Sequence, residues 1–142
     1  TCPRAGTISF NIKQLNHGLV AAILNDYFNI AVRNECFCAH PYVEKMLELT
    51  HHIQINEARA KNITDWHSEP WMGMVRVSFG LYNNHEDVDQ FIHALKNIAA
   101  NQELYKKHYT FNENGDYEHT TFQFSCNEYF SLSQNVMDEL DL

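Results

Sequence analysis

The sequence predicts an α+β fold: a small, mostly antiparallel sheet covered by helices on one face, with a β-hairpin appended at the C-terminal end. Short segments of alternating apolar and polar residues predict the strands, and stretches with apolar residues at helical spacing predict the helices. The pair Asn114-Gly115 between two aromatic-rich runs, 109–111 and 117–124, predicts the hairpin. A chain of 142 residues is long enough to bury one core.

The core strands are predicted at residues 7–13, 29–33 and 74–80, where each segment has one apolar and one polar face. The residues expected to be buried together are Ile8, Phe10, Ile12, Val32, Val75, Val77 and Phe79 from the strands, with Leu24, Phe91 and Leu95 from the helices. The polar face carries Lys13, Arg33, Arg76 and Ser78. Two arginines on an uncovered face must be exposed to water or dock against an anionic group.

Three helix starts are recognisable. Asn16 is suited to cap a helix that runs to Phe28, and Pro41 is suited to the first turn of a short helix. Asn84 with Asp87 predicts a capped helix that runs to Ala99.

We expect residues 1–101 to form one domain, with an insertion or long loop at about 50–72, and residues 102–142 to form a hairpin extension of it. The stretch 50–72 is polar and weakly periodic, so it and the termini are predicted to be the least ordered parts.

The net charge of −8, from 18 acidic and 10 basic residues, argues against nucleic acid or an anionic membrane as a partner. No apolar run reaches the ~18 residues of a membrane span, and residues 1–10 have no signal-peptide pattern. Cys36 and Cys38 are too close to bridge each other readily, which favours a reducing cytoplasm.

The residues that suggest a reactive site lie in the segment 30–41. Arg33 ends a predicted strand, Cys38 follows five residues later, and Pro41 starts a helix. A fixed cation and a helix start can stabilise a thiolate, which is the nucleophilic form of cysteine. On spacing alone, a small buried thiol is the commoner reading of Cys38.

Three ordered motifs make a family resemblance specific. Residues 31–41 read A-V-R-x-x-x-x-C-A-x-P, which resembles the cysteine-bearing segment of the cysteine desulfurases related to selenocysteine lyase, in the class V aminotransferase family. Residues 76–83 read R-x-S-x-x-x-Y-N before an acidic helix, and residues 6–11 read G-x-x-S-F-N, both similar to landmarks of that family's small domain. The resemblance spans about residues 5–100.

The resemblance implies a role for three residues. Arg76 would pair with the α-carboxylate of an amino-acid substrate, and Arg33 would lie close to the substrate before a mobile cysteine loop. Cys38 would accept sulfur from the substrate as a persulfide. Which reaction of the family applies (desulfurase, selenocysteine lyase, aminotransferase or epimerase-like) stays open.

The family also implies a cofactor and partners. Its members hold pyridoxal phosphate on a lysine of a large domain, and no lysine of this chain has that context. We therefore expect this chain to be the C-terminal small domain, without cofactor or activity of its own. Its expected partners are the large pyridoxal-phosphate domain of the same polypeptide, an amino-acid substrate and a second copy in a homodimer.

The chain departs from the desulfurase pattern just before the cysteine. Desulfurases usually have Gly-His-His there, whereas this chain has Glu35-Cys36-Phe37. The change removes the backbone freedom of glycine and an imidazole that could stack on or protonate the substrate adduct.

Two other functional classes stay open. A small zinc-binding domain could use Cys36, Cys38 and His40, completed by His51, His52 or Cys126, although C-x-C-x-H is not a common spacing of zinc ligands. A freestanding, non-enzymatic interaction module could instead dock an anionic partner on the two arginines. The first hypothesis, a small domain of a class V enzyme, assigns no metal ligand.

Overall fold

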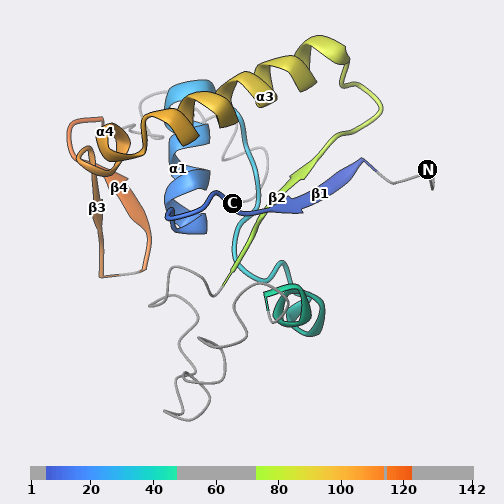
Figure 1. Ribbon diagram of the computed structural model, residues 1–142, viewed down its shortest axis with the longest axis horizontal. Helices are drawn as coiled ribbons and strands as arrows, with labels where there is room; N and C mark the ends of the chain where they lie inside the picture. The colour runs from blue at the N-terminus through green and yellow to red at the C-terminus, as the bar shows by residue number, and fades with distance from the viewer. Residues whose placement is uncertain (1–5, 48–72, 114, 123–142) are drawn as a thin grey trace, which may run out of the picture.

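A computed structural model describes residues 6–47, 73–113 and 115–122 (Figure 1). The described elements, in chain order, are β1 (Thr7–Phe10), α1 (His17–Phe28), β2 (Val75–Ser78), α3 (His85–Ala100), α4 (Gln102–Lys106), β3 (Tyr109–Phe111) and β4 (Tyr117–His119). Residues 40–47 form one further helix between α1 and β2. The α+β class is confirmed. The predicted insertion at 50–72 lies outside the described residues.

The central sheet is smaller than predicted. β1 pairs antiparallel with β2, from Thr7 opposite Ser78 to Phe10 opposite Val75. Of the predicted strand 29–33, only Arg33 pairs, in an isolated bridge to Arg76. The prediction of a third full strand is wrong.

The way α1 ends explains why residues 29–33 do not form a third strand. Asn29 takes the left-handed conformation (φ 53°) and its N–H donates to the Asn25 carbonyl, while the N–H of Ile30 donates to the Leu24 carbonyl. With Asn29 as the left-handed residue, its bond to the carbonyl four residues earlier is that of the αL C-cap motif. Residues 29 and 30 therefore terminate the helix and are not available to extend a strand.

One face of the sheet packs under α1 and α3, and the main core lies there (Figure 1). Of the predicted core residues, Leu24, Val75, Val77 and Phe91 are buried, and Phe10, Ile12, Val32, Phe79 and Leu95 pack against them. Ile8 is 49% exposed, so its predicted burial is wrong. Ile8 lies on β1, whereas α1 packs mainly on β2 and covers its neighbour Val77.

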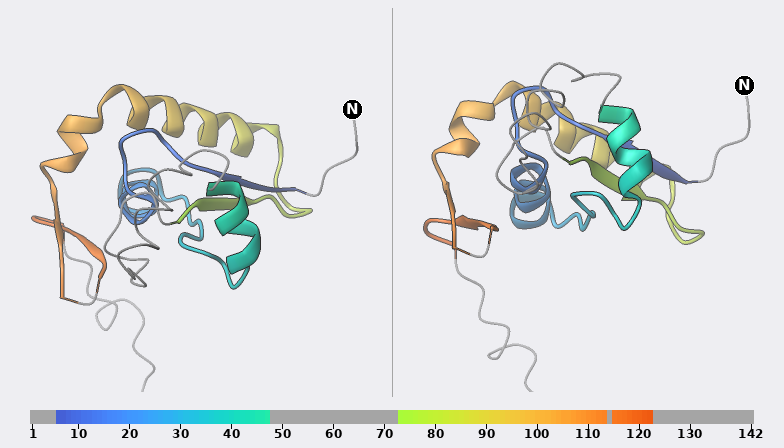
Figure 2. Two further views of the ribbon diagram at one scale, coloured as in Figure 1. Left: turned by 60° about the horizontal axis from the view of Figure 1, so that its bottom comes forward. Right: turned by 90° about the horizontal axis from the view of Figure 1, so that it is seen from below.

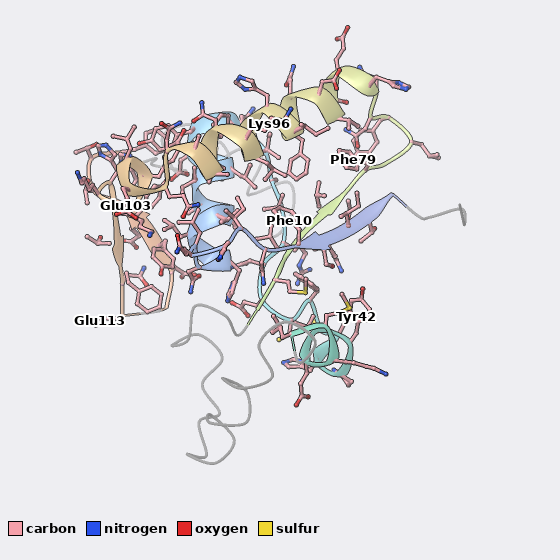
Figure 3. All side chains as sticks on the ribbon, viewed as in Figure 1. Phe10, Tyr42, Phe79, Lys96, Glu103 and Glu113 are labelled. Carbon is pink, nitrogen blue, oxygen red and sulfur yellow. The ribbon has the colours of Figure 1, made fainter. Side chains whose placement is uncertain are left out.

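Aromatic rings close the core between the sheet and α3. The Phe91 ring lies edge-on to Phe10 and to Phe79, with both centroid distances 5.8 Å. Figure 3 shows Phe10 and Phe79 between the strands and α3. Edge-to-face contacts at this distance are favourable for aromatic pairs.

The opposite face of the sheet was expected to be uncovered, and it is covered at one end. The sheet lies between α3 and the helix over residues 40–47 (Figure 2). Met74 packs there with Cys36, Val43 and Leu47 in a second small core, with Phe37 at its edge. Arg76 is next on this face, so it lies at the boundary between the second core and solvent.

The predicted hairpin is confirmed, with a second strand shorter than the predicted run 117–124: β3 pairs antiparallel with β4, which ends at His119, and Gly115 (φ 90°) lies in the connecting turn. Its side chains dock it on α1. The Tyr109 hydroxyl donates to Asp26 Oδ2 at 2.9 Å, and the Tyr27 hydroxyl lies 2.8 Å from His119 Nε2. Burial, followed by the hydrogen bond to Asp26, raises the pKa of Tyr109.

The short helix α4 joins α3 to the hairpin and was not predicted separately. Its Tyr105 is buried in the main core, and its hydroxyl donates to Asn97 Oδ1 at 2.9 Å. Among the described residues, no helix has both the length and the apolar character needed to cross a membrane.

The predicted cap of α3 is a complete capping box. Asn84 Oδ1 accepts from the N–H groups of Glu86 (2.7 Å) and Asp87 (3.1 Å), and Asp87 Oδ2 accepts from the N–H of Asn84 (2.9 Å).

Asn84→Ala is expected to lower the free energy of unfolding by about 1 kcal/mol in urea titrations. Lys96→Ala, on the exposed side of the same helix, is the control; an equal loss in both variants would contradict the role of the cap.

The capping box also predicts a pH dependence. The hydrogen bond from the Asn84 backbone, and then that from the Asn83 side chain, lowers the pKa of Asp87. A carboxyl whose folded pKa is lowered stabilises the fold above its unfolded pKa and loses that contribution as the pH falls through the folded pKa. The stability difference between wild type and Asp87→Asn should therefore be complete near neutral pH and shrink in acid.

Candidate functional site

Arg33 and Arg76 lie directly opposite each other. The Arg33 N–H donates to the Arg76 carbonyl at 3.0 Å, and the Arg76 N–H donates to the Arg33 carbonyl at 2.7 Å. This reciprocal bonding defines a hydrogen-bonded antiparallel pair, in which the two Cα atoms are about 5.5 Å apart and the side chains leave on the same face. The two guanidinium groups therefore start side by side.

Ser9 continues the line of Arg33 and Arg76 onto β1, and we call these three residues the arginine row. It is the register partner of Arg76, and because the Arg76 backbone bonds to Arg33, Ser9 and Arg76 form a non-hydrogen-bonded pair with Cα atoms about 4.5 Å apart. Further along this face, Thr7 Oγ1 donates to Ser78 Oγ at 3.3 Å. The face thus presents two cations beside hydroxyl groups.

Arg76 is partly buried, whereas Arg33 is exposed. The Arg76 guanidinium carbon lies 5.1 Å from the centre of the Phe37 ring, and its Nε is buried without a hydrogen-bond partner. Within the described residues, neither arginine forms an ion pair. Two adjacent cations without a counter-ion, presenting planar forks of N–H donors, suit a carboxylate or another oxyanion.

The cysteine segment forms a tight turn at residues 35–38, next to this row. Glu35, Phe37 and Cys38 all have positive φ, at 72°, 50° and 61°. Non-glycine residues adopt this region at a cost, so the surrounding structure must hold them there. The Met74 N–H donates to the Glu35 carbonyl at 3.1 Å, and this bond ties the turn to the start of β2.

The position of Glu35 is the one at which the desulfurase pattern has glycine. Its φ of 72° is a conformation that glycine adopts readily and glutamate does not. The turn therefore has a backbone shape suited to glycine, although glutamate occupies the position.

The two thiols of the turn have different environments. Cys36 is buried in the second core, and its burial, followed by the charges of Glu35 and Glu44, raises the pKa of its thiol. Cys38 is exposed, and both cysteines are free. Only the thiolate is nucleophilic, so the turn presents Cys38 to reagents and keeps Cys36 protonated.

Alkylation by iodoacetamide at neutral pH should show this difference. Cys38 is expected to react faster than Cys36 by about tenfold or more, measured by peptide mass mapping over time. In urea the two rates should converge, because the burial of Cys36 is lost. Equal rates in the native protein would contradict the assignment of Cys36 to the second core.

Gly73 lies at a tightly packed position just before β2. It is buried, and its carbonyl accepts from Asn11 Nδ2 at 2.9 Å. A Cβ atom at Gly73 would lie close against the buried His17 imidazole, 2.4 Å from its Cδ2. Asn11 belonged to a recognised motif, but neither His17 nor Gly73 could be predicted, because no sequence pattern indicates a packing contact between residues so far apart.

Gly73→Ala is expected to lower the free energy of unfolding by about 1–3 kcal/mol, as overpacking does, because the buried imidazole has little room to move. Gly80→Ala is a matched control. Its Cβ would lie 2.7 Å from the Tyr82 ring, but Tyr82 is 88% exposed and can swing away. Similar losses for both variants, measured by urea unfolding, would show that the contact with His17 is not the cause.

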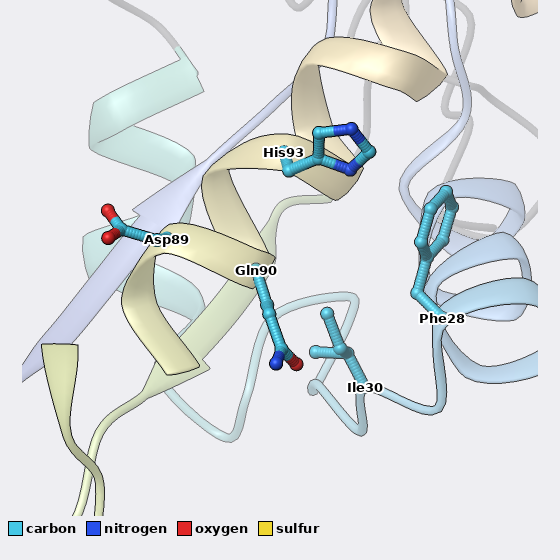
Figure 4. A pocket seen from close by; sticks show the side chains of 5 residues that line it. All are labelled: Phe28, Ile30, Asp89, Gln90 and His93. Atoms are coloured by element: carbon cyan, nitrogen blue, oxygen red, sulfur yellow. The ribbon is translucent and has the colours of Figure 1, made fainter. Parts of the chain in front are cut away.

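A hollow of about 320 Å³ lies elsewhere, between the end of α1 and α3. It is lined by Phe28, Ile30, Asp89, Gln90 and His93 (Figure 4). Phe28 and Ile30 pack against the main core, on the helix side of the sheet. The hollow is therefore separate from the arginine row.

The described residues contain no cluster of side chains that could bind zinc. Cys36 is buried while Cys38 and His40 are exposed, and no three His, Cys, Asp or Glu side chains of the described segments gather around a common point. The further candidates His51, His52 and Cys126 lie outside those segments.

The described lysines do not fit a covalent site for pyridoxal phosphate. Lys13, Lys45, Lys96 and Lys107 are exposed, and Lys106 Nζ donates to Glu103 at 2.8 Å. A Schiff-base lysine needs a desolvated pocket with groups that hold the cofactor. None of the described lysines has such surroundings.

Known proteins resemble this chain in sequence. A molybdenum cofactor sulfurase of Bombyx mori is 31% identical over 86 residues, which cover 58% of this chain and 10% of the relative. Molybdenum cofactor sulfurase 2 of Culex quinquefasciatus is 28% identical over 97 residues, 63% of this chain and 13% of the relative. The chain thus spans about a tenth of the length of these curated relatives.

No solved structure gives a significant match. The family model described as aminotransferase class-V matches residues 1–91, the part that contains the arginine row and the cysteine turn. The chain belongs to the class V aminotransferase family.

Proposed function

We propose that this chain is the substrate-binding small domain of a pyridoxal-phosphate enzyme that removes sulfur from an amino acid, with Arg76 and Arg33 binding the carboxylate and Cys38 accepting the sulfur. The observation that carries the proposal is the pairing of the two arginines next to the turn that exposes Cys38. Membership of the class V family supports the cofactor and the substrate class.

The arginine row supports binding of a carboxylate. Arg76 is partly buried, so its hydrogen bonds to an anion are less screened than those of a fully exposed side chain. Its planar fork matches the two oxygens of a carboxylate. Arg33 is exposed and adds charge at the rim, where solvent weakens its contribution.

Sulfur transfer would use the exposed thiol. The Cys38 sulfur, as a thiolate, attacks the thiol sulfur of the substrate, so an S–S bond forms and the substrate C–S bond breaks. The electron pair of the broken bond stays on carbon, which takes up a proton. In balance, L-cysteine and the Cys38 thiol become alanine and a Cys38 persulfide.

The two relatives are named for sulfuration of the molybdenum cofactor, and this supports a second part of the proposal. The persulfide sulfur of Cys38 would be delivered to that cofactor as the final acceptor. The exposure of Cys38 is compatible with transfer to a second substrate that arrives from solvent.

The cofactor would be held by a large domain of the same polypeptide, since the described lysines are exposed or ion-paired. The arginine row and the cysteine turn would face that domain, because Arg33, Cys38 and Ser78 are exposed on this side of the sheet. A homodimer is proposed for the intact enzyme on the same family grounds.

Trapping the persulfide tests the proposal. The full-length enzyme, with pyridoxal phosphate, is incubated with L-cysteine and then alkylated and digested. The mass of the peptide that contains Cys38 is measured by mass spectrometry. One additional sulfur atom on Cys38, removed by a reductant and absent when L-alanine replaces L-cysteine, is expected. An enzyme that turns over L-cysteine with the extra sulfur on another residue would overturn the role of Cys38.

A further inference from the structure

The Phe37 ring lies against the guanidinium of Arg76, with 5.1 Å between the guanidinium carbon and the ring centre. Both side chains are partly buried. The face of an aromatic ring attracts a cation, and the attraction grows as water is excluded. The contact therefore holds the guanidinium on one side without using any of its N–H donors.

The donors of Arg76 stay available for a ligand. A polar side chain at position 37 could accept hydrogen bonds from the guanidinium and so compete with a carboxylate, whereas a phenyl ring cannot. Nε is buried and has no hydrogen-bond partner among the described residues, and a buried donor of this kind gains when an acceptor arrives. The Phe37 ring thus orients the Arg76 guanidinium and leaves its N–H donors free to bind a ligand.

The position of Phe37 is itself fixed by the strained turn. Phe37 has a φ of 50° and its neighbour Cys38 a φ of 61°, and the Ala39 N–H closes the turn on the Cys36 carbonyl at 2.7 Å. Cys36 anchors the turn in the second core with Val43 and Leu47. The backbone conformation that exposes Cys38 is therefore also the one that places the ring against Arg76.

We infer that Phe37 is a positioning residue for substrate: it holds the Arg76 guanidinium for the carboxylate and couples carboxylate binding to the turn that bears Cys38. The inference rests on the proposed role of Arg76. The residue acts through Arg76 and not on the substrate itself.

Fluorination of the ring is the sharpest test, because it weakens the negative ring face while nearly preserving its shape. In the full-length enzyme, a trifluorinated phenylalanine at position 37 is expected to raise KM for L-cysteine about 2- to 10-fold and to leave the unfolding midpoint in urea unchanged. The same substitution at Phe79, whose ring packs on Phe91 on the helix side, is the matched control and should leave KM unchanged. An unchanged KM at position 37 would overturn the inference.

A double-mutant cycle separates this inference from the proposed function. Phe37→Leu should raise KM in the wild-type background and have no further effect in Arg76→Ala, and Phe37→Trp should restore a low KM. If Arg76→Ala itself leaves KM unchanged, the proposed function fails. If Arg76→Ala raises KM but the effect of Phe37→Leu is the same in both backgrounds, only the positioning role fails.

Discussion

Arg76→Ala in the full-length enzyme is expected to raise KM for L-cysteine roughly 10- to 150-fold. A hydrogen-bonded contact with a charged group contributes about 1.5–3 kcal/mol, and each 1.36 kcal/mol corresponds to a tenfold change. The effect should approach the upper end because Arg76 is partly buried and carries no competing ion pair among the described residues. Steady-state kinetics with L-cysteine measures it.

Two further variants show whether charge or geometry is lost. Arg76→Lys keeps the charge but not the planar fork, so its KM should lie between those of wild type and Arg76→Ala. Lys96→Ala removes a cation from the exposed side of α3 (Figure 3) and should leave KM unchanged. If all three variants raised KM equally, a general effect of net charge would explain the result and a specific carboxylate contact would not.

The alternation of apolar and polar residues was sufficient to place both arginines on one face. Val75 and Val77 identify the buried side around Arg76, and Val32, which packs against the same core, does so for Arg33. It could not show that Arg33 and Arg76 are register partners. That pairing depends on where the chain leaves α1, and the left-handed turn at Asn29 shortens the third strand to a single residue. Caps were easier to predict: Asn16 and Asn84 act within two or three residues of their own positions.

The surroundings of the site were harder to predict than its residues. Cys36 and Cys38 look alike in sequence, and only the second core distinguishes the buried thiol from the exposed one. The contact of Phe37 with Arg76 joins residues far apart in the chain, so no local pattern indicates it. The glutamate at position 35 was visible in the sequence, but its positive φ was not.

Cys38→Ser is expected to abolish sulfur transfer and to leave binding of L-cysteine intact. A serine hydroxyl cannot accept sulfur as a persulfide, so the rate of alanine formation from L-cysteine should fall by about 10⁴-fold or more, as on removal of other catalytic nucleophiles. Any transamination should persist, since it needs the carboxylate contact with Arg76 but not the thiol. Alanine production and keto-acid production, assayed separately, measure the two reactions.

Cys36→Ala provides the comparison that makes this prediction specific. Cys36 is buried in the second core, so its truncation should lower stability modestly through lost packing and leave sulfur transfer close to wild type. If Cys36→Ala abolished sulfur transfer while Cys38→Ser retained it, the acceptor would be the buried thiol and the turn at 35–38 would have to open during the reaction. If both variants retained sulfur transfer, the acceptor would lie elsewhere in the enzyme, and the exposed thiol of this turn would have no part in the chemistry.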